Sequence, residues 1–289
     1  MITNQREAPL VPRSRRSVLY LPASNLRAIE KARTLPCDGV ILDLEDGVAP
    51  EAKGIAREQA VAAVRSGQFG SREMIVRVNG SDTEWGAEDL MAIGQAVPDA
   101  ILLPKINSAA ELLGYERRLG AACEVPLWAM IETTRSVLAI GDIAAAATIS
   151  RLVCLVMGTN DLAKETGSQP DKGRTPFLGI LGLSVVAARA YGLAILDGVY
   201  NDLEDQAGFA QECRQAVAFG FDGKTLIHPR QIEGCNATFS PDAEAIAWAE
   251  RVIRAFEEPT NADKGALRIN GKMVERLHLE QARRVLAKA

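Results

Sequence analysis

Eight short apolar runs recur along the chain, and polar or turn-forming residues follow each of them. Short apolar runs bounded in this way are typical of buried β-strands, and segments with helical spacing of apolar residues separate them. This alternation predicts parallel strands joined by right-handed helical crossovers. The predicted strands cover residues 17–21, 39–43, 74–78, 100–103, 127–131, 152–157, 194–199 and 222–227, and the predicted helices cover residues 25–35, 50–65, 83–96, 108–121, 134–147, 178–191 and 203–218.

The sequence therefore predicts an α/β protein, a (β/α)8 TIM barrel with a small C-terminal helical extension. Its 289 residues suit one barrel of about 250 residues plus an appendage. An open, doubly wound sheet is the alternative. Against it, no Gly-x-Gly-x-x-Gly follows the first run, and the number of predicted strands is eight.

Three segments are expected along the chain. A flexible N-terminal arm covers residues 1–15, and the barrel with its terminal amphipathic helix covers residues 16–257. A C-terminal lid or extension follows over residues 258–289. Within it we expect an irregular polar stretch over 258–271 and a last helix near 273–289.

Composition excludes several classes of partner. The formal net charge is −4 and the isoelectric point is about 5.5, so no basic field attracts nucleic acid or an anionic membrane surface. No run approaches the roughly 18 apolar residues of a membrane span, and the first residues do not read as a signal peptide. The five cysteines are scattered without a Cys-x-x-Cys pair, which indicates reduced thiols in a cytoplasmic protein.

Two acids at the ends of neighbouring predicted strands are the strongest candidates for a metal site. Glu132 closes the fifth run and Asp161 follows the sixth, so both face the C-terminal mouth of a barrel, where its active site lies. Two carboxylates without a histidine suit Mg²⁺, with Mn²⁺ as the alternative ion. The other interpretation is that Glu132 caps the following helix and Asp161 forms a local turn.

Charged residues at three further strand ends complete the candidate site. Arg77 lies inside an apolar strand, and a buried guanidinium needs an anionic partner. That partner is either an internal carboxylate, Glu45 or Asp46, or an oxygen of the substrate. Lys105 is a candidate substrate-binding residue, and a Schiff-base role is the alternative. His228 reads as structural or as a secondary polar contact, and two histidines leave little material for a Ser-His-Asp hydrolase.

These motifs, taken together and in this order, resemble the HpcH/HpaI aldolase–citrate lyase superfamily. Within it, they resemble the citrate lyase β-subunit-like branch that contains the malyl-CoA and citramalyl-CoA lyases. The resemblance covers about residues 15–289. The matching segments are residues 16–22, 43–46, 77–79, 103–105, 131–133, 158–162, 197–200, 220–224, 227–229, 239–241 and 271–274.

The resemblance implies a trimeric or hexameric barrel that uses Mg²⁺ to cleave or form a C–C bond between an acyl thioester and a 2-oxo acid. Glu132 and Asp161 match the metal ligands of the family, and Arg77 matches its substrate-binding arginine. The lyases use their C-terminal tail to complete a neighbour's site, and the position of their catalytic Asp is here Glu275. A second departure is Asn160, where relatives have Glu.

The leading hypothesis is a Mg²⁺-dependent C–C lyase that splits a 3-hydroxyacyl-CoA, such as malyl-CoA or citramalyl-CoA, into an acyl-CoA and a 2-oxo acid. In it, Arg77, Glu45 and Glu275 are catalytic, while Arg77, Asp46 and Lys105 bind the substrate. The alternatives are the citryl-acyl-carrier lyase subunit of a citrate lyase complex, a malyl-CoA thioesterase, and a barrel that binds CoA or dicarboxylates without turnover.

Overall fold

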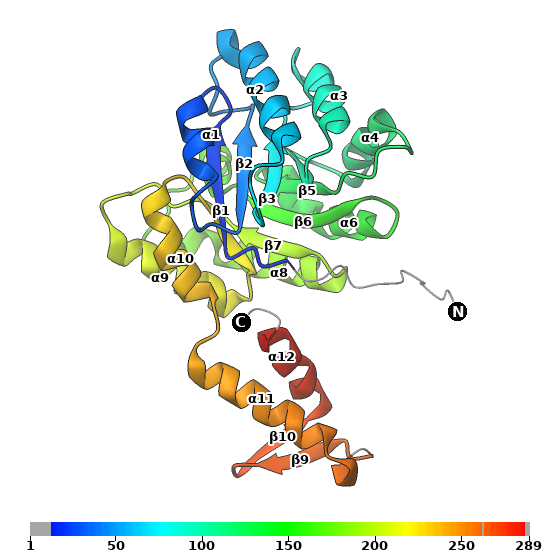
Figure 1. Cartoon of the computed structure of the whole chain (residues 1–289), viewed down its shortest axis with the longest axis vertical. Helices are drawn as coiled ribbons and strands as arrows, with labels where there is room; N and C mark the ends of the chain where they lie inside the picture. The colour runs from blue at the N-terminus through cyan, green and yellow to red at the C-terminus, as the bar shows by residue number, and fades with distance from the viewer. Residues whose placement is uncertain (1–12, 262, 287–289) are drawn as a thin grey trace. The chain divides into compact units, whose positions relative to one another are not determined.

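The computed structural model of the protein describes residues 13–261 and 263–286. Eight parallel strands form a closed barrel in which neighbours in the chain are neighbours in the sheet, and the first strand pairs with the last (Figure 1). The predicted TIM barrel is therefore confirmed. The strands are β1 (Ser17–Pro22), β2 (Gly39–Asp43), β3 (Glu73–Arg77), β4 (Ala100–Leu103), β5 (Leu127–Ile131), β6 (Leu152–Met157), β7 (Ala194–Asp197) and β8 (Gly223–Leu226).

Helices connect successive strands of the barrel. The sequence predicts one helix over 134–147, but the structure has two helices and a 3-10 turn there, because the backbone leaves helical geometry at Ala139. Two helices of eight residues, α7 and α10, are missed because they hold only about two turns of periodicity. The helices are α1 (Leu26–Ala32), α2 (Lys53–Ser66), α3 (Gly86–Ala96), α4 (Ala109–Leu119), α5 (Thr134–Leu138), α6 (Ile140–Ala145), α7 (Thr159–Thr166), α8 (Leu178–Ala190), α9 (Gln206–Phe219) and α10 (Ile232–Phe239), and the 3-10 turns are η1 (Pro50–Ala52), η2 (Ala146–Thr148), η3 (Thr175–Phe177) and η4 (Pro229–Gln231).

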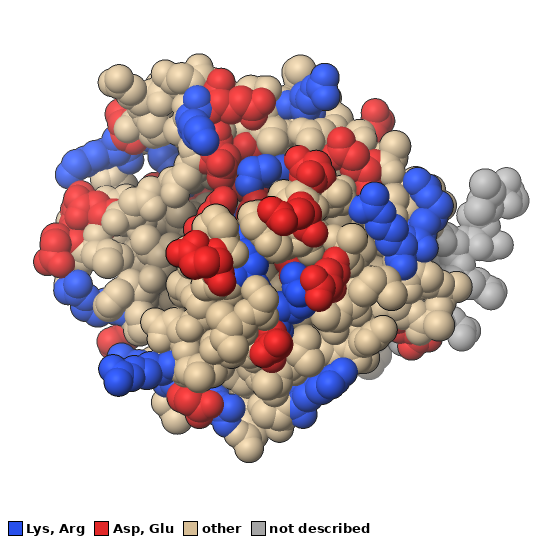
Figure 2. All heavy atoms as spheres, turned by 90° about the horizontal axis from the view of Figure 1, so that it is seen from above, with Lys and Arg blue, Asp and Glu red and all other residues tan. Residues whose placement is uncertain are grey.

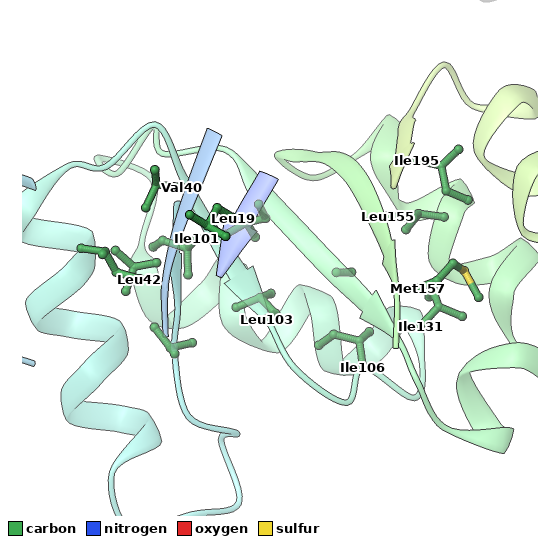
Figure 3. Close-up of a cluster of buried hydrophobic side chains, with 14 of the residues drawn as sticks. Leu19, Val40, Leu42, Ile101, Leu103, Ile106, Ile131, Leu155, Met157 and Ile195 are labelled. Atoms are coloured by element: carbon green, nitrogen blue, oxygen red, sulfur yellow. The ribbon is translucent and has the colours of Figure 1, made fainter. Parts of the chain in front are cut away.

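Side chains alternate along each strand between the barrel interior and the helices. One buried cluster contains strand residues alone, among them Ile41, Ile75 and Trp128, and it fills the interior. The residues between them, such as Val40 and Ile101, belong to a second cluster that includes helix residues (Figure 3). Side chains on a strand repeat their direction every second residue. A residue two positions after one of the interior cluster therefore also points inward, at the mouth of the barrel.

The other end of the barrel includes a residue that the sequence assigns to the flexible arm. The Arg15 guanidinium donates to both carboxylate oxygens of Glu73 at 2.7 and 2.8 Å and lies 5.1 Å from the centre of the Trp128 ring. Arg15 is therefore fixed to the barrel, and the arm predicted over 1–15 is wrong at this residue. Residues 1–12 of that arm lie outside the described residues.

A second compact unit begins at Ser240, after the barrel unit that ends at Phe239. It consists of α11 (Ala243–Glu257), η5 (Pro259–Asn261), β9 (Ala266–Ile269), β10 (Lys272–Glu275) and α12 (Arg276–Leu286). The sequence places α11 with the barrel, but the apolar face of α11 packs within this unit. Val252 and Phe256 of α11 form one buried cluster with Val274 and Leu279.

The stretch predicted to be irregular, residues 258–271, contains the first strand and the turn of an antiparallel hairpin. β9 and β10 pair from Ile269 with Lys272, and the two residues between them, Asn270 and Gly271, have φ of 50° and 79°. An Asn-Gly pair with positive φ at both positions is the preferred two-residue hairpin turn. The sequence signal was therefore present, and the last helix begins three residues later than predicted because β10 occupies its expected start.

All five cysteines lie within the described residues and are free. No helix in the described part of the chain is long and apolar enough to cross a membrane.

Candidate active site

A cavity of about 410 Å³ opens among the ends of the barrel strands. Arg77, Glu132 and Asp161, which the sequence predicts to act together, all line it. Asp46 lines it as well, whereas Glu45 and Lys105 do not. The remaining lining residues are Tyr20, Pro22, Asp43, Gly47, Met130, Met157, Gly158, Thr159, Asn160, Val199, Thr225 and Ile227.

Arg77 is anchored mainly by an aspartate that sequence reasoning does not choose as its partner. Its Nε and Nη2 donate to the two carboxylate oxygens of Asp43 at 2.6 and 2.7 Å. Burial raises the pKa of Asp43, but the charge and hydrogen bonds of Arg77 outweigh it and hold that pKa below its usual value. The predicted partners are secondary: Glu45 lies 2.8 Å and Asp46 lies 3.6 Å from Nη1.

The same aspartate also organises the loop that follows β2. Its two carboxylate oxygens accept hydrogen bonds from the main-chain N–H groups of Glu45 and Gly47 at 2.9 and 2.8 Å. A Cβ at Gly47 would lie 2.7 Å from Asp43 Oδ2, so the loop needs glycine there. Asp43 therefore fixes both the guanidinium and the loop beside it.

Glu45 stands between two cations behind the cavity wall. Its carboxylate pairs with Arg77 and forms a short ion pair with the Lys105 ammonium. Burial raises the pKa of Glu45 despite both cations, whereas the hydrogen bond and charge of Glu45 outweigh burial and raise the pKa of Lys105. A protonated, ion-paired lysine is a poor nucleophile, so this geometry does not support the Schiff-base alternative.

Glu132 presents one unsatisfied carboxylate oxygen at the cavity. Its Oε1 accepts the Lys105 main-chain N–H at 2.7 Å, while Oε2 is buried without a hydrogen-bond partner among the described residues. Burial, helped by the negative charge of Glu45, raises the pKa of Glu132 to about 8. A buried carboxylate with a free oxygen is an arrangement that a cation completes.

Asp161 lies in the first turn of α7, directly after β6, and faces the same cavity. β5 and β6 are paired, and a Cβ at Gly158 would lie 2.6 Å from Glu132 Oε2, so glycine allows the close approach. Among the described residues no group of three His, Cys, Asp or Glu side chains forms a ready metal site. Two carboxylates fit Mg²⁺, which retains waters and takes substrate oxygens.

Side-chain contacts decide between the functional and the structural interpretations of Glu132 and His228. Glu132 does not cap the following helix, because the Thr133 side chain accepts the Ser136 N–H at 3.0 Å and caps α5. His228 does not line the cavity. Its Nδ1 accepts the Arg230 N–H and caps η4, so its role is structural.

Several lining residues were not identified from the sequence. Tyr20 places its ring 5.1 Å from the Arg77 guanidinium, and its hydroxyl lies 3.7 Å from Met130 Sδ. Both follow the interior period of their strands, which is the signal that could have found them. Asn160, noted as a departure from the family, exchanges hydrogen bonds with Asn201 at 2.7 and 3.3 Å.

Glu275 belongs to the C-terminal unit and ends β10. Its side chain is exposed, and its main-chain N–H donates to His278 Nδ1 at 2.9 Å. Its catalytic role therefore stays a prediction.

On the face drawn in Figure 2, acidic and basic side chains are interspersed, in keeping with a chain that carries no basic field.

Comparisons with known proteins agree with the barrel fold. The model of the HpcH/HpaI aldolase/citrate lyase family matches residues 16–229. A (3S)-malyl-CoA thioesterase of Cereibacter sphaeroides is 50% identical over 274 residues, which cover 95% of this chain and 94% of that protein. The citrate lyase β subunit of Escherichia coli is 34% identical over 285 residues, which cover 96% of this chain and 94% of that protein.

A solved structure is similar over almost the whole chain. It is the protein CitE from Mycobacterium tuberculosis in complex with magnesium, acetoacetate and coenzyme A. The TM-score is 0.78 and the sequence identity 32%, with 97% of this chain and 99% of that chain covered.

Proposed function

The chain belongs to the HpcH/HpaI aldolase/citrate lyase family, and from this we propose that it is an enzyme that hydrolyses the thioester of a short 3-hydroxydicarboxylyl-CoA. The first candidate substrate is (3S)-malyl-CoA. The observation that carries this choice is the 50% identity with a (3S)-malyl-CoA thioesterase over 95% of the chain. The sequence predicts C–C cleavage first, with this hydrolysis among its alternatives.

Glu132 and Asp161 are proposed to hold Mg²⁺, or Mn²⁺ in its place. The unpartnered Glu132 Oε2 and the facing Asp161 supply two hard oxygen donors, and a similar protein was crystallised with magnesium. When bound, the ion supplies a Lewis acid for the carboxylate and hydroxyl oxygens of the acid portion. The two residues would therefore position the acid portion of the substrate in the cavity.

Arg77 is proposed to contact the thioester carbonyl oxygen. In hydrolysis a water oxygen bonds to the carbonyl carbon, the C–S bond breaks, and CoA leaves as its thiol. Negative charge develops on the carbonyl oxygen, and a fixed guanidinium stabilises it by about 3–4 kcal/mol. Asp43 and Glu45 hold Arg77 in place, so no reorganisation is needed at that moment.

The other predicted site residues take graded roles. Asp46 is exposed and lines the cavity, so it is proposed to bind the substrate hydroxyl or a water beside it. Glu45 and Lys105 lie behind the wall and are proposed to hold Arg77 and Glu132 rather than to touch the substrate. Glu275 remains the proposed general acid/base that takes the proton from water.

C–C cleavage is the second candidate, and the match to the β subunit of citrate lyase favours it. The same cavity can serve both reactions, because both develop negative charge on the thioester oxygen. Cleavage releases acetyl-CoA and glyoxylate, whereas hydrolysis releases malate and free CoA. A citryl-acyl-carrier substrate and a trimeric or hexameric assembly stay predictions.

One assay separates these functions. Purified protein is incubated with (3S)-malyl-CoA and Mg²⁺, and free thiol and glyoxylate are measured on the same samples, with Glu132→Gln as the matched control. Free thiol formed together with malate supports the thioesterase, and glyoxylate formed together with acetyl-CoA supports the lyase. If the protein binds malyl-CoA or citramalyl-CoA but forms no product from either, the result supports a barrel that binds these compounds without turnover.

A further inference from the structure

A buried lysine behind the cavity has no part in the site described so far. Lys53 begins α2, is 5% exposed, and places its ammonium beneath the loop that follows β2. Its Nζ donates to Leu44 O and Glu45 O at 2.7 Å each and to Asn79 Oδ1 at 2.8 Å. An ammonium has three protons, so these three acceptors saturate it.

The loop that Lys53 holds carries the acids of the site. Its N–H groups are already engaged: Leu44 N–H donates to Arg77 O, and Glu45 N–H donates to the Asp43 carboxylate. The carbonyls of Leu44 and Glu45 point the other way, toward α2. Each carbonyl has one further partner, since Leu44 O also accepts from Asn79 and Glu45 O accepts the Val48 N–H at 3.0 Å, but Lys53 is the group that joins the two.

A polar network behind the loop fixes the ammonium in turn. Asn79 donates to Leu44 O at 2.8 Å and to Asp89 Oδ2 at 2.6 Å. Arg57 donates to the other oxygen of Asp89 at 2.6 Å. The loop is thus tied to α2 and α3 by charged groups, and Lys53 is the member of this network that bonds both the Leu44 and the Glu45 carbonyls.

We propose that Lys53 is a positioning residue, which fixes the main chain of Leu44 and Glu45 so that the Glu45 carboxylate stays between Arg77 and Lys105. It makes no contact with the cavity and acts only through Glu45. The inference rests on the proposed function only in so far as turnover takes place at Arg77. An uncharged side chain of similar length cannot satisfy three buried acceptors.

The first test needs no substrate. In Lys53→Met, the amides of the segment 43–48 are expected to exchange with deuterium about tenfold faster, since the carbonyls of Leu44 and Glu45 lose the ammonium that joins them and keep one partner each. The matched control is Arg72→Met. Arg72 also clamps two main-chain carbonyls, those of Leu35 and Phe69, but at the opposite end of the barrel. That control is expected to leave exchange in 43–48 unchanged.

The second test is a double-mutant cycle with Glu45→Gln, read as kcat/KM for thiol release from malyl-CoA. Lys53→Met is expected to lower kcat/KM about tenfold in the wild-type background and less than about threefold in Glu45→Gln, because the effect passes through Glu45. The loss of melting temperature is expected to be equal in both backgrounds. Arg72→Met is expected to lower melting temperature without changing kcat/KM.

Two results overturn the inference: unchanged exchange in 43–48, or a loss of kcat/KM that is equally large in both backgrounds. Lys53→Gln, which keeps two N–H donors, replaces Lys53→Met in both tests if the methionine variant does not fold. If the wild type releases no product from any thioester tested, the proposed function fails, and the exchange measurement still decides whether Lys53 holds the loop.

Discussion

Two buried ionic clusters lie at strand ends of this barrel, and only one faces the cavity. In the first, Arg77 is held by Asp43 and Glu45. In the second, Lys224 donates to Asp197 at 2.9 Å and to Glu212 at 2.5 Å, and both Lys224 and Asp197 are fully buried. Both clusters pair buried carboxylates with a buried cation, but only the cluster of Arg77 lies beside the cavity.

The two clusters differ in strand parity, that is, in whether their strand residues point to the barrel interior or to the helices. Asp43 and Arg77 are paired across β2 and β3 and follow the interior residues Ile41 and Ile75 by two positions, so they point into the mouth of the barrel. Lys224 occupies the opposite parity on β8 and reaches Glu212 of α9. The charged groups of the first cluster can therefore reach a substrate in the cavity, whereas those of the second are buried between the barrel and the helices.

The largest effect is expected at the acids beside the open cluster. Glu132→Gln or Asp161→Asn should lower kcat/KM by an amount that corresponds to a loss of about 4 kcal/mol of transition-state stabilisation, because each removes a ligand of the proposed ion. Chelation by EDTA should abolish turnover, and Mg²⁺ or Mn²⁺ should restore it. Full turnover in the presence of EDTA would remove the metal from the proposal.

Glu275 extends the comparison to a residue outside the barrel unit. Glu275→Gln should lower kcat about 10²-fold or more, as expected for loss of a general acid/base, with little change in melting temperature because the side chain is exposed. Glu275→Asp should keep most of the activity and, in the thiol and glyoxylate assay, show whether the shorter acid shifts products toward cleavage. A Glu275→Gln protein as active as the wild type would leave catalysis to the barrel alone.

A direct contrast between the clusters uses one variant in each. Arg77→Lys keeps the charge but loses the planar fork, so kcat/KM should fall about 10²-fold while the melting temperature falls little. Lys224→Met leaves buried carboxylates without their lysine and should cost about 3 kcal/mol or more of the free energy of unfolding, with kcat/KM of the folded protein little changed. Equal losses of activity and stability in both variants would contradict the division by parity.

The architecture was accessible from the sequence because buried parallel strands leave a clear apolar pattern. The hairpin of β9 and β10 was missed although Asn270 and Gly271 mark its turn, because polar residues surround it and one face of it alone is buried. α7 and α10 were missed because short helices hold too little periodicity. Local signals therefore failed where the elements are short.

The sequence identifies the main residues of the site but not which of them pair with each other. The sequence brings Arg77, Glu132 and Asp161 to one end of the barrel, and the structure places all three on one cavity. It does not choose Asp43 as the main partner of Arg77, although parity and strand register pair the two. Lys53 had no signal, because a lysine in the first turn of a helix reads as exposed.

The smallest expected effect is a difference in acid stability between the clusters. Burial raises the pKa of Asp43 and of Asp197, but the cations beside each outweigh it and hold both below the usual 3.8. The stability that each contributes is therefore present above about pH 3.8 and is lost as the pH falls below it, through the folded pKa.

Lys224→Met removes a cation that lowers the pKa of Asp197, so part of the acid-sensitive stability should be absent from this variant at neutral pH already. Each unit by which that pKa rises removes about 1.4 kcal/mol. Urea midpoints at pH 7, 4 and 3 should thus fall less in Lys224→Met than in the wild type, while Arg77→Lys, which keeps a cation on Asp43, should follow the wild type. An equal fall in all three proteins would show that the sealed cluster does not set the acid limit of the fold.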